Sequence, residues 1–570
     1  MPAILLALIV LGAFFLGYRY YSKYLAEKVY ALDKQFVTPA HEFEDGVDYV
    51  PTNKHILFGH HFTSVAGAAP ITGPAIAVVW GWLPALLWVT LGTIFASGAH
   101  DFGAIVVSAR NRAQNIGTLA QAIITPRART LFLIIIFFLL TLVNAVFAIV
   151  IGTLFISYPG AVIPSAVVIP IAMAIGQLVY RRRGSVLLPT IIGLVLLYAT
   201  IPLGQAIPIQ IDGLAGALGL APLTMWVLII FAYTWFAARL PVWLLLQPRD
   251  YINSYQLFIA LGLIFLGVLI GFETMSAPAL NSDRPADTPF WFPFLFITIA
   301  CGAISGFHSL VSSGTTSKQI DNETDARYIG YMGSLGEGSL ALASILACTA
   351  GIGAAGYQQG YIDAPDFATV SGAAVPTFVE GVSEFTSNLG IPAALGAIFI
   401  SVVVITFAGT SLDTSVRLQR YVVQEIGEIV RIRFLARNLT FAATVAVLIS
   451  IGLALFPTGG EVGDFAFGRL WQLFGTTNQL TAGLALAVIA VWVFMRGRNP
   501  LAAIIPLVFL LAMTTWALFI NLGNFFAEGS WLLLVIDAVI FVLSLWLIVE
   551  AIAAFNRVRA MRNRQETGEQ

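Results

Sequence analysis

Two histidine motifs that begin and end with glycine mark the residues best placed to do chemistry. The first begins at Gly59 and holds His61, the second begins at Gly306 and holds His308, and both read Gly-x-His-x5-Gly. Each lies in a segment apolar enough to cross a bilayer, yet too rich in Gly, Pro, Ser and Thr to remain one helix. A matched pair of interrupted spans is typical of the substrate site of a secondary transporter.

The first segment predicts a site for an anion. Pro70 and Pro74 each lack a backbone N–H and clash with the preceding turn, so we expect a break over residues 66–74. A half-helix would then begin near Pro74, capped by Thr72 or Gly73, and direct its free N–H groups into mid-membrane. A carboxylate suits such a terminus. The substrate contacts that we predict here are His61, Ser64, Gly67, Ala68 and Gly73.

The second segment offers hydroxyl groups and another break. We place this break within residues 312–317, where serine, glycine and threonine follow one another. Irregular backbone at membrane depth is tolerated where it lines a cavity or is buried in protein. The predicted substrate contacts are His308, Ser312, Ser313 and Gly314. The alternative is that both segments are kinked helices with a purely structural role.

Charged residues inside apolar spans supply candidates for coupling. Such residues are costly in lipid and usually face a cavity or the bundle interior. Arg239 would bind an anionic substrate, or form a structural ion pair with Asp101 or Glu337. The paired hydroxyls at residues 410–411 would either ligate sodium or satisfy the backbone of their own helix. The predicted coupling residues are His100, Asp101, Glu337, Thr410 and Ser411.

Several other functions lack the residues that they need. We find no Gly-Lys-Ser/Thr phosphate loop, no protease arrangement of Ser-His-Asp or His-Glu-x-x-His, and no further ligands in register with His60 and His61. We therefore expect no enzyme activity, no metal site and no cofactor. A formal net charge of −1 argues against a nucleic-acid partner.

Composition predicts an all-α polytopic membrane protein. The 570 residues are 58% hydrophobic and only 10% charged, as expected of a chain embedded in a lipid bilayer. A span needs about 20 mostly apolar residues, and about fifteen stretches qualify. If these spans alternate, the basic clusters all fall on one side, which predicts an outside N-terminus and a cytoplasmic C-terminus.

Alternation also makes the two broken segments antiparallel, as inverted-topology repeats require. We predict four parts: residues 1–55, a first helix and cytoplasmic loop; 56–289, the first repeat with intervening helices; 290–554, the second repeat with C-terminal helices; and 555–570, a basic cytoplasmic tail. The two broken spans stand seven apart in this count. Either two extra helices are present, or the repeat is seven-plus-seven.

At these same residues the chain resembles the carbon starvation protein A family. The shared motifs include Phe58-Gly59-His60-His61, Gly67-Ala68-Ala69-Pro70, His100-Asp101-Phe102, Pro248-Arg249-Asp250-Tyr251, Ser305-Gly306-Phe307-His308 and Phe474-Gly475-Thr476-Thr477-Asn478-Gln479. The resemblance implies an inner-membrane uptake system for pyruvate or peptides, induced when carbon is scarce and driven by a cation gradient. It also implies a leucine-transporter-like five-plus-five inverted repeat.

Taken together, the residues and the resemblance predict a cation-coupled importer of a small carboxylate such as pyruvate, with H⁺ or Na⁺ as the coupling ion. A peptide carrier is the alternative. An ion channel or a membrane sensor is the alternative outside the transporter class, although a filter or signalling domain is not evident in the sequence.

Overall fold

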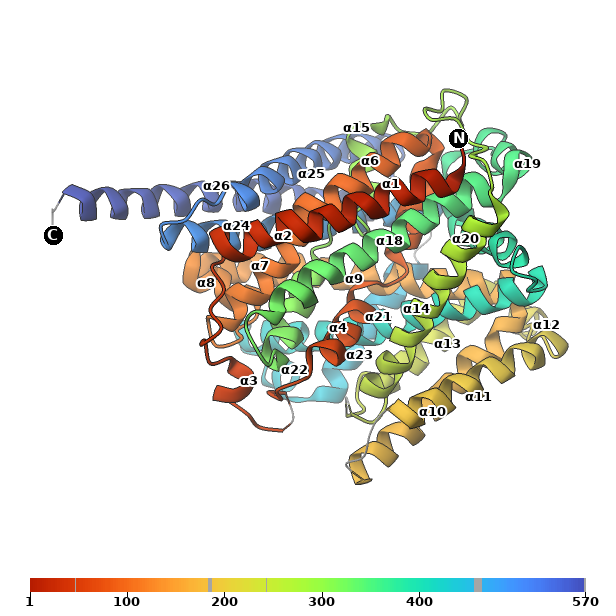
Figure 1. Cartoon of the computed structure of the whole chain (residues 1–570), viewed down its shortest axis with the longest axis horizontal. Helices are drawn as coiled ribbons and strands as arrows, with labels where there is room; N and C mark the ends of the chain where they lie inside the picture. The colour runs from red at the N-terminus through yellow and green to blue at the C-terminus, as the bar shows by residue number, and fades with distance from the viewer. Residues whose placement is uncertain (47, 183–186, 242, 456–463, 568–570) are drawn as a thin grey trace.

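The computed structural model describes the whole chain except residues 47, 183–186, 242, 456–463 and 568–570. Its described residues form helices joined by loops, with two isolated β-bridges and no longer strand. Figure 1 shows the long helices running roughly along one direction, with the two termini at opposite ends of the bundle. An odd number of spans places the termini in this way. The fold is all-α, as the composition predicted.

Eleven helices in the described residues are long and apolar enough to cross a membrane, or twelve if the bent pair near the N-terminus counts as one span. Two shorter apolar helices, α13 (Pro222–Ala237) and α23 (Leu439–Leu455), and the interrupted segment α15–α17 are further candidates for predicted spans. The count of about fifteen therefore stays a prediction. Residues 555–567 of the expected basic tail continue helix α26 (Trp531–Thr567), and residues 568–570 lie outside the described part.

The first broken span consists of α4 (Lys54–Val65) and α5 (Ala69–Ala77), whose axes bend by 48°. The break is shorter than predicted and covers only residues 66–68. Ala68 is the N-cap of α5 and makes no side-chain cap, so the expected cap at Thr72 or Gly73 is wrong. Pro70 occupies the first turn, where its missing N–H costs nothing, and Pro74 lies inside α5.

The second broken span is interrupted earlier than predicted. Helix α15 (Trp291–Thr298) ends before an irregular stretch over residues 299–306, and α16 (Phe307–Val311) follows. The predicted break at residues 312–317 is wrong, because this stretch continues as a π-helical turn (Ser312–Thr316) and α17 (Ser317–Gln319). Its hydroxyls bond back to their own helix, as Ser313 does to the Ser309 carbonyl at 2.6 Å. The true break contains Gly302, whose φ of +91° favours glycine.

The helices of the two halves pack in matching ways. The long helices α9 (Pro126–Ser157) and α21 (Ala393–Ile429) pack against each other in the centre. Helix α13 packs on α9 in the first half, and α23 packs on α21 in the second. Likewise, α14 (Leu246–Gly271) packs on α4 in the first half, and α24 (Asp464–Met495) packs on α16 in the second. Helices α10 (Val162–Arg182) and α11 (Leu187–Ala206) pack on each other, and no such hairpin follows α21 in the second half of the described chain.

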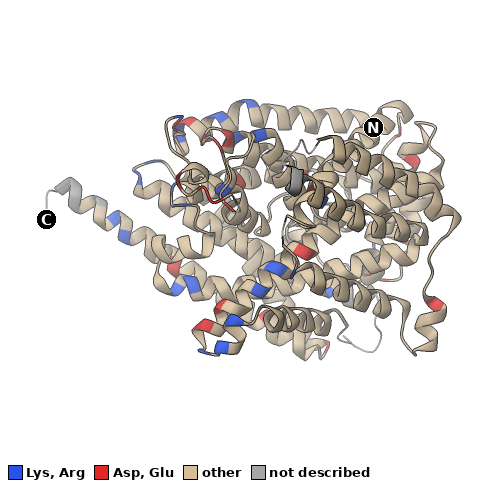
Figure 2. Cartoon of the chain, turned by 90° about the horizontal axis from the view of Figure 1, so that it is seen from below, with Lys and Arg blue, Asp and Glu red and all other residues tan. Residues whose placement is uncertain are grey.

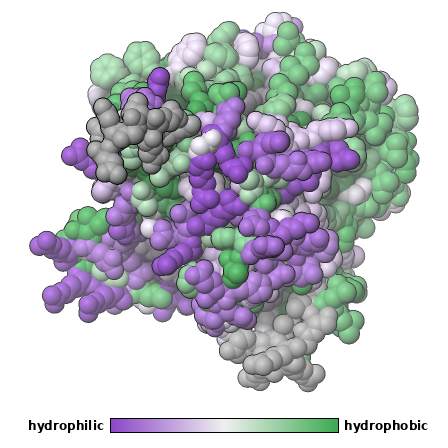
Figure 3. Space-filling model, turned by 60° about the vertical axis from the view of Figure 1, so that its left-hand side comes forward, coloured by the Kyte–Doolittle hydropathy of each residue, from purple (hydrophilic) through white to green (hydrophobic). Residues whose placement is uncertain are grey.

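Charge is distributed unevenly along the direction of the helices. Figure 2 shows Lys and Arg mostly toward the end from which the C-terminal helix projects. The same end presents a largely hydrophilic face bordered by hydrophobic flanks (Figure 3). Hydrophobic flanks between polar ends are the arrangement that a bilayer requires.

Candidate functional site

A buried carboxylate, Asp101, forms the centre of the candidate site. Three groups lie within hydrogen-bonding distance of it: His100 Nδ1 at 2.7 Å, His308 Nδ1 at 2.9 Å and the Ser334 hydroxyl at 2.7 Å. They come from α7 (Gly98–Ala109), α16 and α18 (Met332–Leu346), and all four side chains are completely buried. The fold thus brings together residues that the sequence could only list separately.

Glu337 extends this cluster to the second broken span. Its Oε1 lies 3.4 Å from His308 Nε2 and accepts the backbone N–H of Gly302 at 3.0 Å. Because Gly302 lies inside the break, the carboxylate of Glu337 helps to hold the irregular backbone in place. His308 therefore stands between two carboxylates, with one nitrogen toward each. We call Asp101, His308 and Glu337 the carboxylate–histidine cluster.

The geometry of this cluster favours a proton on His308 or Glu337. When His308 Nδ1 donates to the Asp101 carboxylate, a neutral ring turns its Nε2 lone pair toward a carboxylate oxygen of Glu337. A proton on either group removes that repulsion. With one such proton the cluster still carries one net negative charge, and an unbalanced charge in a buried site is costly. The cluster is thus suited to take up a further cation or proton.

His61 contacts the same region from the first broken span. Its Nδ1 lies 2.8 Å from the Thr316 hydroxyl, and its ring packs so close to Gly333 that a Cβ there would lie 2.8 Å from it. Its Nε2 is buried without a hydrogen-bond partner among the described residues, as is the hydroxyl of Ser312. Buried polar atoms of this kind need a partner, which a bound water or substrate supplies.

The first break lies against α21. A Cβ on Gly67 would come within 2.7 Å of the Ser411 hydroxyl and 3.2 Å of the Phe147 ring, so glycine allows this close approach. The Ser411 hydroxyl has no hydrogen-bond partner in the described chain, whereas Thr410 accepts the side-chain amide of Asn253 at 2.8 Å. The predicted contact Gly67 and the predicted coupling residue Ser411 therefore meet at one point.

Most of the remaining predicted substrate contacts lie at the crossing of the two broken spans, at hydrogen bonds within the protein, or at a break. The two broken spans cross at Gly73, where a Cβ would lie 2.5 Å from the Thr298 carbonyl oxygen. Ser64 bonds to the His60 carbonyl of its own helix, and Ser313 accepts the backbone N–H of Ile116. Ala68 is buried at the break, and Gly314 adjoins open space.

Arg239 does not lie with the other candidates. Its side chain is exposed, and its guanidinium stacks on Trp235 at 4.2 Å from the ring centroid. The predicted ion pair between Arg239 and Asp101 or Glu337 is absent from the described contacts.

Arg249 is a buried arginine that was not among the predicted site residues. Arg249 lies 2.8 Å from Asp413 and donates to the Tyr233 hydroxyl at 2.6 Å, and Tyr233 donates to Asp413 at 2.9 Å. The neighbouring Asp250 lies 3.5 Å from His60 of α4. Helix α14 begins at residue 246 and includes this Arg-Asp pair, whereas a search for apolar runs excludes such charged residues. The sequence signal that could have found Arg249 is the Arg-Asp pair directly before the apolar run.

Tyrosines cover the other end of the first broken span. Tyr357 donates to the Val78 carbonyl and Tyr361 to the Ala75 carbonyl, both at 2.8 Å. Burial raises the pKa of both hydroxyls, so they remain donors at physiological pH.

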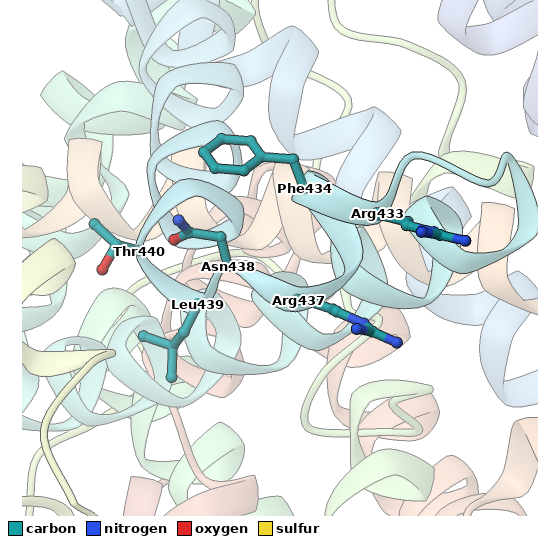
Figure 4. Close-up of a pocket in the computed structure, with 6 residues that line it drawn as sticks. All are labelled: Arg433, Phe434, Arg437, Asn438, Leu439 and Thr440. Carbon is teal, nitrogen blue, oxygen red and sulfur yellow. The ribbon is translucent and has the colours of Figure 1, made fainter.

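A separate surface pocket lies open at the turn between α22 (Arg433–Arg437) and α23 (Figure 4). It is lined by Arg433, Phe434, Arg437, Asn438, Leu439 and Thr440. No predicted site residue lines it.

Comparison with known proteins identifies the family. The profile described as "Carbon starvation protein CstA" matches residues 2–364 and 362–517. The chain belongs to the CstA family. It is 32% identical to the pyruvate/proton symporter BtsT of Escherichia coli, over 90% of this chain and 80% of that protein. Like the other curated relatives described here, BtsT is named for transport, and this CstA-family chain is a multi-pass membrane protein.

Two further relatives carry a different substrate in their names. The peptide transporter CstA of Campylobacter jejuni is 31% identical over 90% of this chain and 79% of its own length, and that of E. coli is 32% identical over 88% and 79%. Among solved structures, the Eremococcus coleocola manganese transporter aligns over 91% of this chain and 99% of its own, at 14% identity and a TM-score of 0.45. A score at this level does not establish a common fold.

Proposed function

We propose that this CstA-family chain is a proton-coupled secondary transporter that imports a small carboxylate, pyruvate or a related acid, across the inner membrane when carbon is scarce. One observation carries the proposal: buried His308 lies between the carboxylates of Asp101 and Glu337, and Glu337 binds the backbone at the second break. Protonation would then change the contacts of a broken span, which is how a proton gradient does work on a conformational equilibrium.

The substrate carboxylate binds at the first break, at the N-terminus of α5. Within the described residues, the backbone N–H groups of Ala68 and Ala69 meet no backbone carbonyl, and a half-helix end attracts an anion. His61 contributes its unpartnered Nε2 from the same span. Phe147 approaches Gly67 and supplies an apolar wall. An apolar wall with few polar groups suits a small acid.

The matching contacts of the two halves support a five-plus-five inverted repeat. In this assignment the first repeat runs from α4 to α14, beginning two residues before the predicted 56–289, and the second runs from α15 to α24 within residues 290–554. Helices α10 and α11 are the two additional helices, inserted inside the first repeat. The arginine-rich end would face the cytoplasm and the N-terminus the outside.

Contacts on either side of the cluster provide the two gates of alternating access. On the cytoplasmic side, the His60–Asp250 contact ties α4 to α14, and the Arg249–Asp413 pair ties α14 to α21. On the outer side, Tyr357 holds the far end of the first broken span. Opening to the cytoplasm requires breaking the cytoplasmic contacts while the outer contact remains, and opening to the outside requires the reverse.

Sodium is the second candidate for the coupling ion. The unpartnered Ser411 hydroxyl faces Gly67, and hydroxyl and unwound backbone oxygens at such a break suit a sodium ion. The Asp101 and Glu337 carboxylates favour a proton instead, because the His308 ring lies between them and occupies the space that a shared sodium ion would need. The names of the relatives leave peptide uptake as the second candidate for the substrate.

Reconstitution in liposomes tests the proposal. We expect concentrative uptake of radiolabelled pyruvate under an imposed inward proton gradient, abolished by a protonophore and unaffected by unlabelled dipeptide. Accumulation of labelled dipeptide instead would make the protein a peptide carrier. Uptake driven only by a sodium gradient would assign coupling to the Ser411 site, and single-channel currents would overturn the transporter assignment.

A further inference from the structure

An apolar groove runs along the outer face of the C-terminal hairpin, away from the candidate site. Helices α25 (Leu501–Ala527) and α26 lie side by side at the margin of the bundle (Figure 1) and enclose a groove of about 690 Å³. Buried side chains such as Leu511 and Ala551 form its floor. Val508 and Ile552, which expose 60% and 57% of their surface, form its rims.

The dimensions of the groove match one lipid chain. Along α26 its lining extends from Phe541 to Phe555, which corresponds to about 21 Å at 1.5 Å per residue. Half of the hydrocarbon core of a bilayer is about 15 Å thick. An acyl chain that enters at the Phe555 end can therefore lie in the groove down to the middle of the membrane.

Arginines lie at the same end of the groove. Arg559 follows Phe555 by four residues, which places both on one face of α26, and its side chain is exposed. Arg498 lies in the loop before α25 and is partly exposed, with one guanidinium nitrogen bonded to the Lys28 carbonyl. Glu550, five residues before Phe555, is buried and accepts hydrogen bonds from Thr125 and Trp546. The two arginines thus place positive charge at this end of the hairpin.

We propose that this groove binds an anionic phospholipid, with an acyl chain along α25 and α26 and the phosphate on Arg498 and Arg559. A zwitterionic lipid offers the same chain but no net charge, so the arginines would favour the anionic headgroup. Each basic residue near a membrane surface contributes about 1 kcal/mol toward anionic lipid, equivalent to about fivefold in affinity. Loss of both arginines should therefore weaken binding about twenty-five-fold.

Native mass spectrometry of the detergent-purified full chain, titrated with phosphatidylglycerol or phosphatidylcholine of the same acyl chains, tests the headgroup. We expect phosphatidylglycerol to bind at least tenfold more tightly. The double variant Arg498→Gln/Arg559→Gln should lose this preference. The matched control Arg431→Gln/Arg433→Gln, which removes two exposed arginines elsewhere, should keep it. Equal binding of the two lipids, or equal losses in the two double variants, would overturn the proposal.

A second variant tests the groove itself. Ala512 lines the groove and is exposed, so Ala512→Phe fills the space without displacing a buried side chain. It should reduce the binding of both lipids, while Ala553→Phe, on an exposed position of α26 outside the lining, should not. Unchanged lipid binding in Ala512→Phe would overturn the proposal. A lipid-free dimer that this variant abolishes would also overturn it, because the occupant would then be a second copy of the chain.

Discussion

Replacing Glu337 by glutamine should separate substrate movement from the proton gradient. With the amide oxygen in the place of Oε1, glutamine can still accept the Gly302 N–H and face His308 Nε2, while the amide nitrogen takes the place of Oε2. Glutamine therefore keeps the contacts of Oε1 and removes the carboxyl group that exchanges a proton. The fold at the second break should persist, while the group can no longer gain or lose a proton.

The expected magnitude follows from one exchangeable proton in the cluster. One pH unit is worth 1.36 kcal/mol per proton, so symport of one proton per substrate sustains about a tenfold accumulation at zero membrane potential. Glu337→Gln should reduce this ratio to about one. Exchange of labelled for unlabelled substrate needs no net proton movement and should continue.

Proteoliposomes with an inward gradient of one pH unit provide the assay. Accumulation and exchange are measured for the substrate that the unmodified protein concentrates. Glu380→Gln is the matched control, because Glu380 is an exposed residue of α20 (Phe367–Ser387), and it should accumulate as the native protein does. A tenfold, protonophore-sensitive accumulation by Glu337→Gln would refute the assignment of the proton to this cluster.

Three further substitutions test other contacts. Gly73→Ala places a Cβ against the second broken span and should destabilise the protein by about 1–3 kcal/mol in thermal unfolding, while Gly409→Ala, which meets open space, should not; equal effects would contradict the crossing. Arg249→Gln removes the counter-charge of buried Asp413, at a cost of about 3–5 kcal/mol in stability, and adding Asp413→Asn should recover much of that loss; no recovery would argue against the pair. His61→Ala should weaken substrate binding in a scintillation proximity assay, and undiminished binding would remove His61 from the site.

The cost of charge in lipid made part of the site predictable from the sequence. Asp101 and Glu337 stood out because an ionisable residue inside an apolar span needs a buried partner, and His308 stood out because it belongs to one of the two glycine-bounded motifs. That these residues are one another's partners depends on three helices meeting, and Asp101 and His308 are 207 positions apart. A pattern in a short segment of sequence cannot predict a contact between residues so far apart in the chain.

The two misplaced features have local causes. Serine and glycine suggested a break at residues 312–317, but the Ser313 hydroxyl bonds to its own helix, and the break forms where Gly302 adopts a positive φ. Arg239 was selected because it lies inside a predicted apolar span, whereas Arg249 lies in the first turns of a helix, which are too charged for a hydropathy window to include.

The sequence by itself determined the membrane class, the family and the presence of two interrupted spans, because hydropathy, motif spacing and proline are properties of short segments. The tertiary structure decided which charges are paired, where the second span breaks and which residues meet at Gly67. Those outcomes depend on contacts between helices distant in the chain, where burial makes every unpaired polar atom costly and so selects its partner.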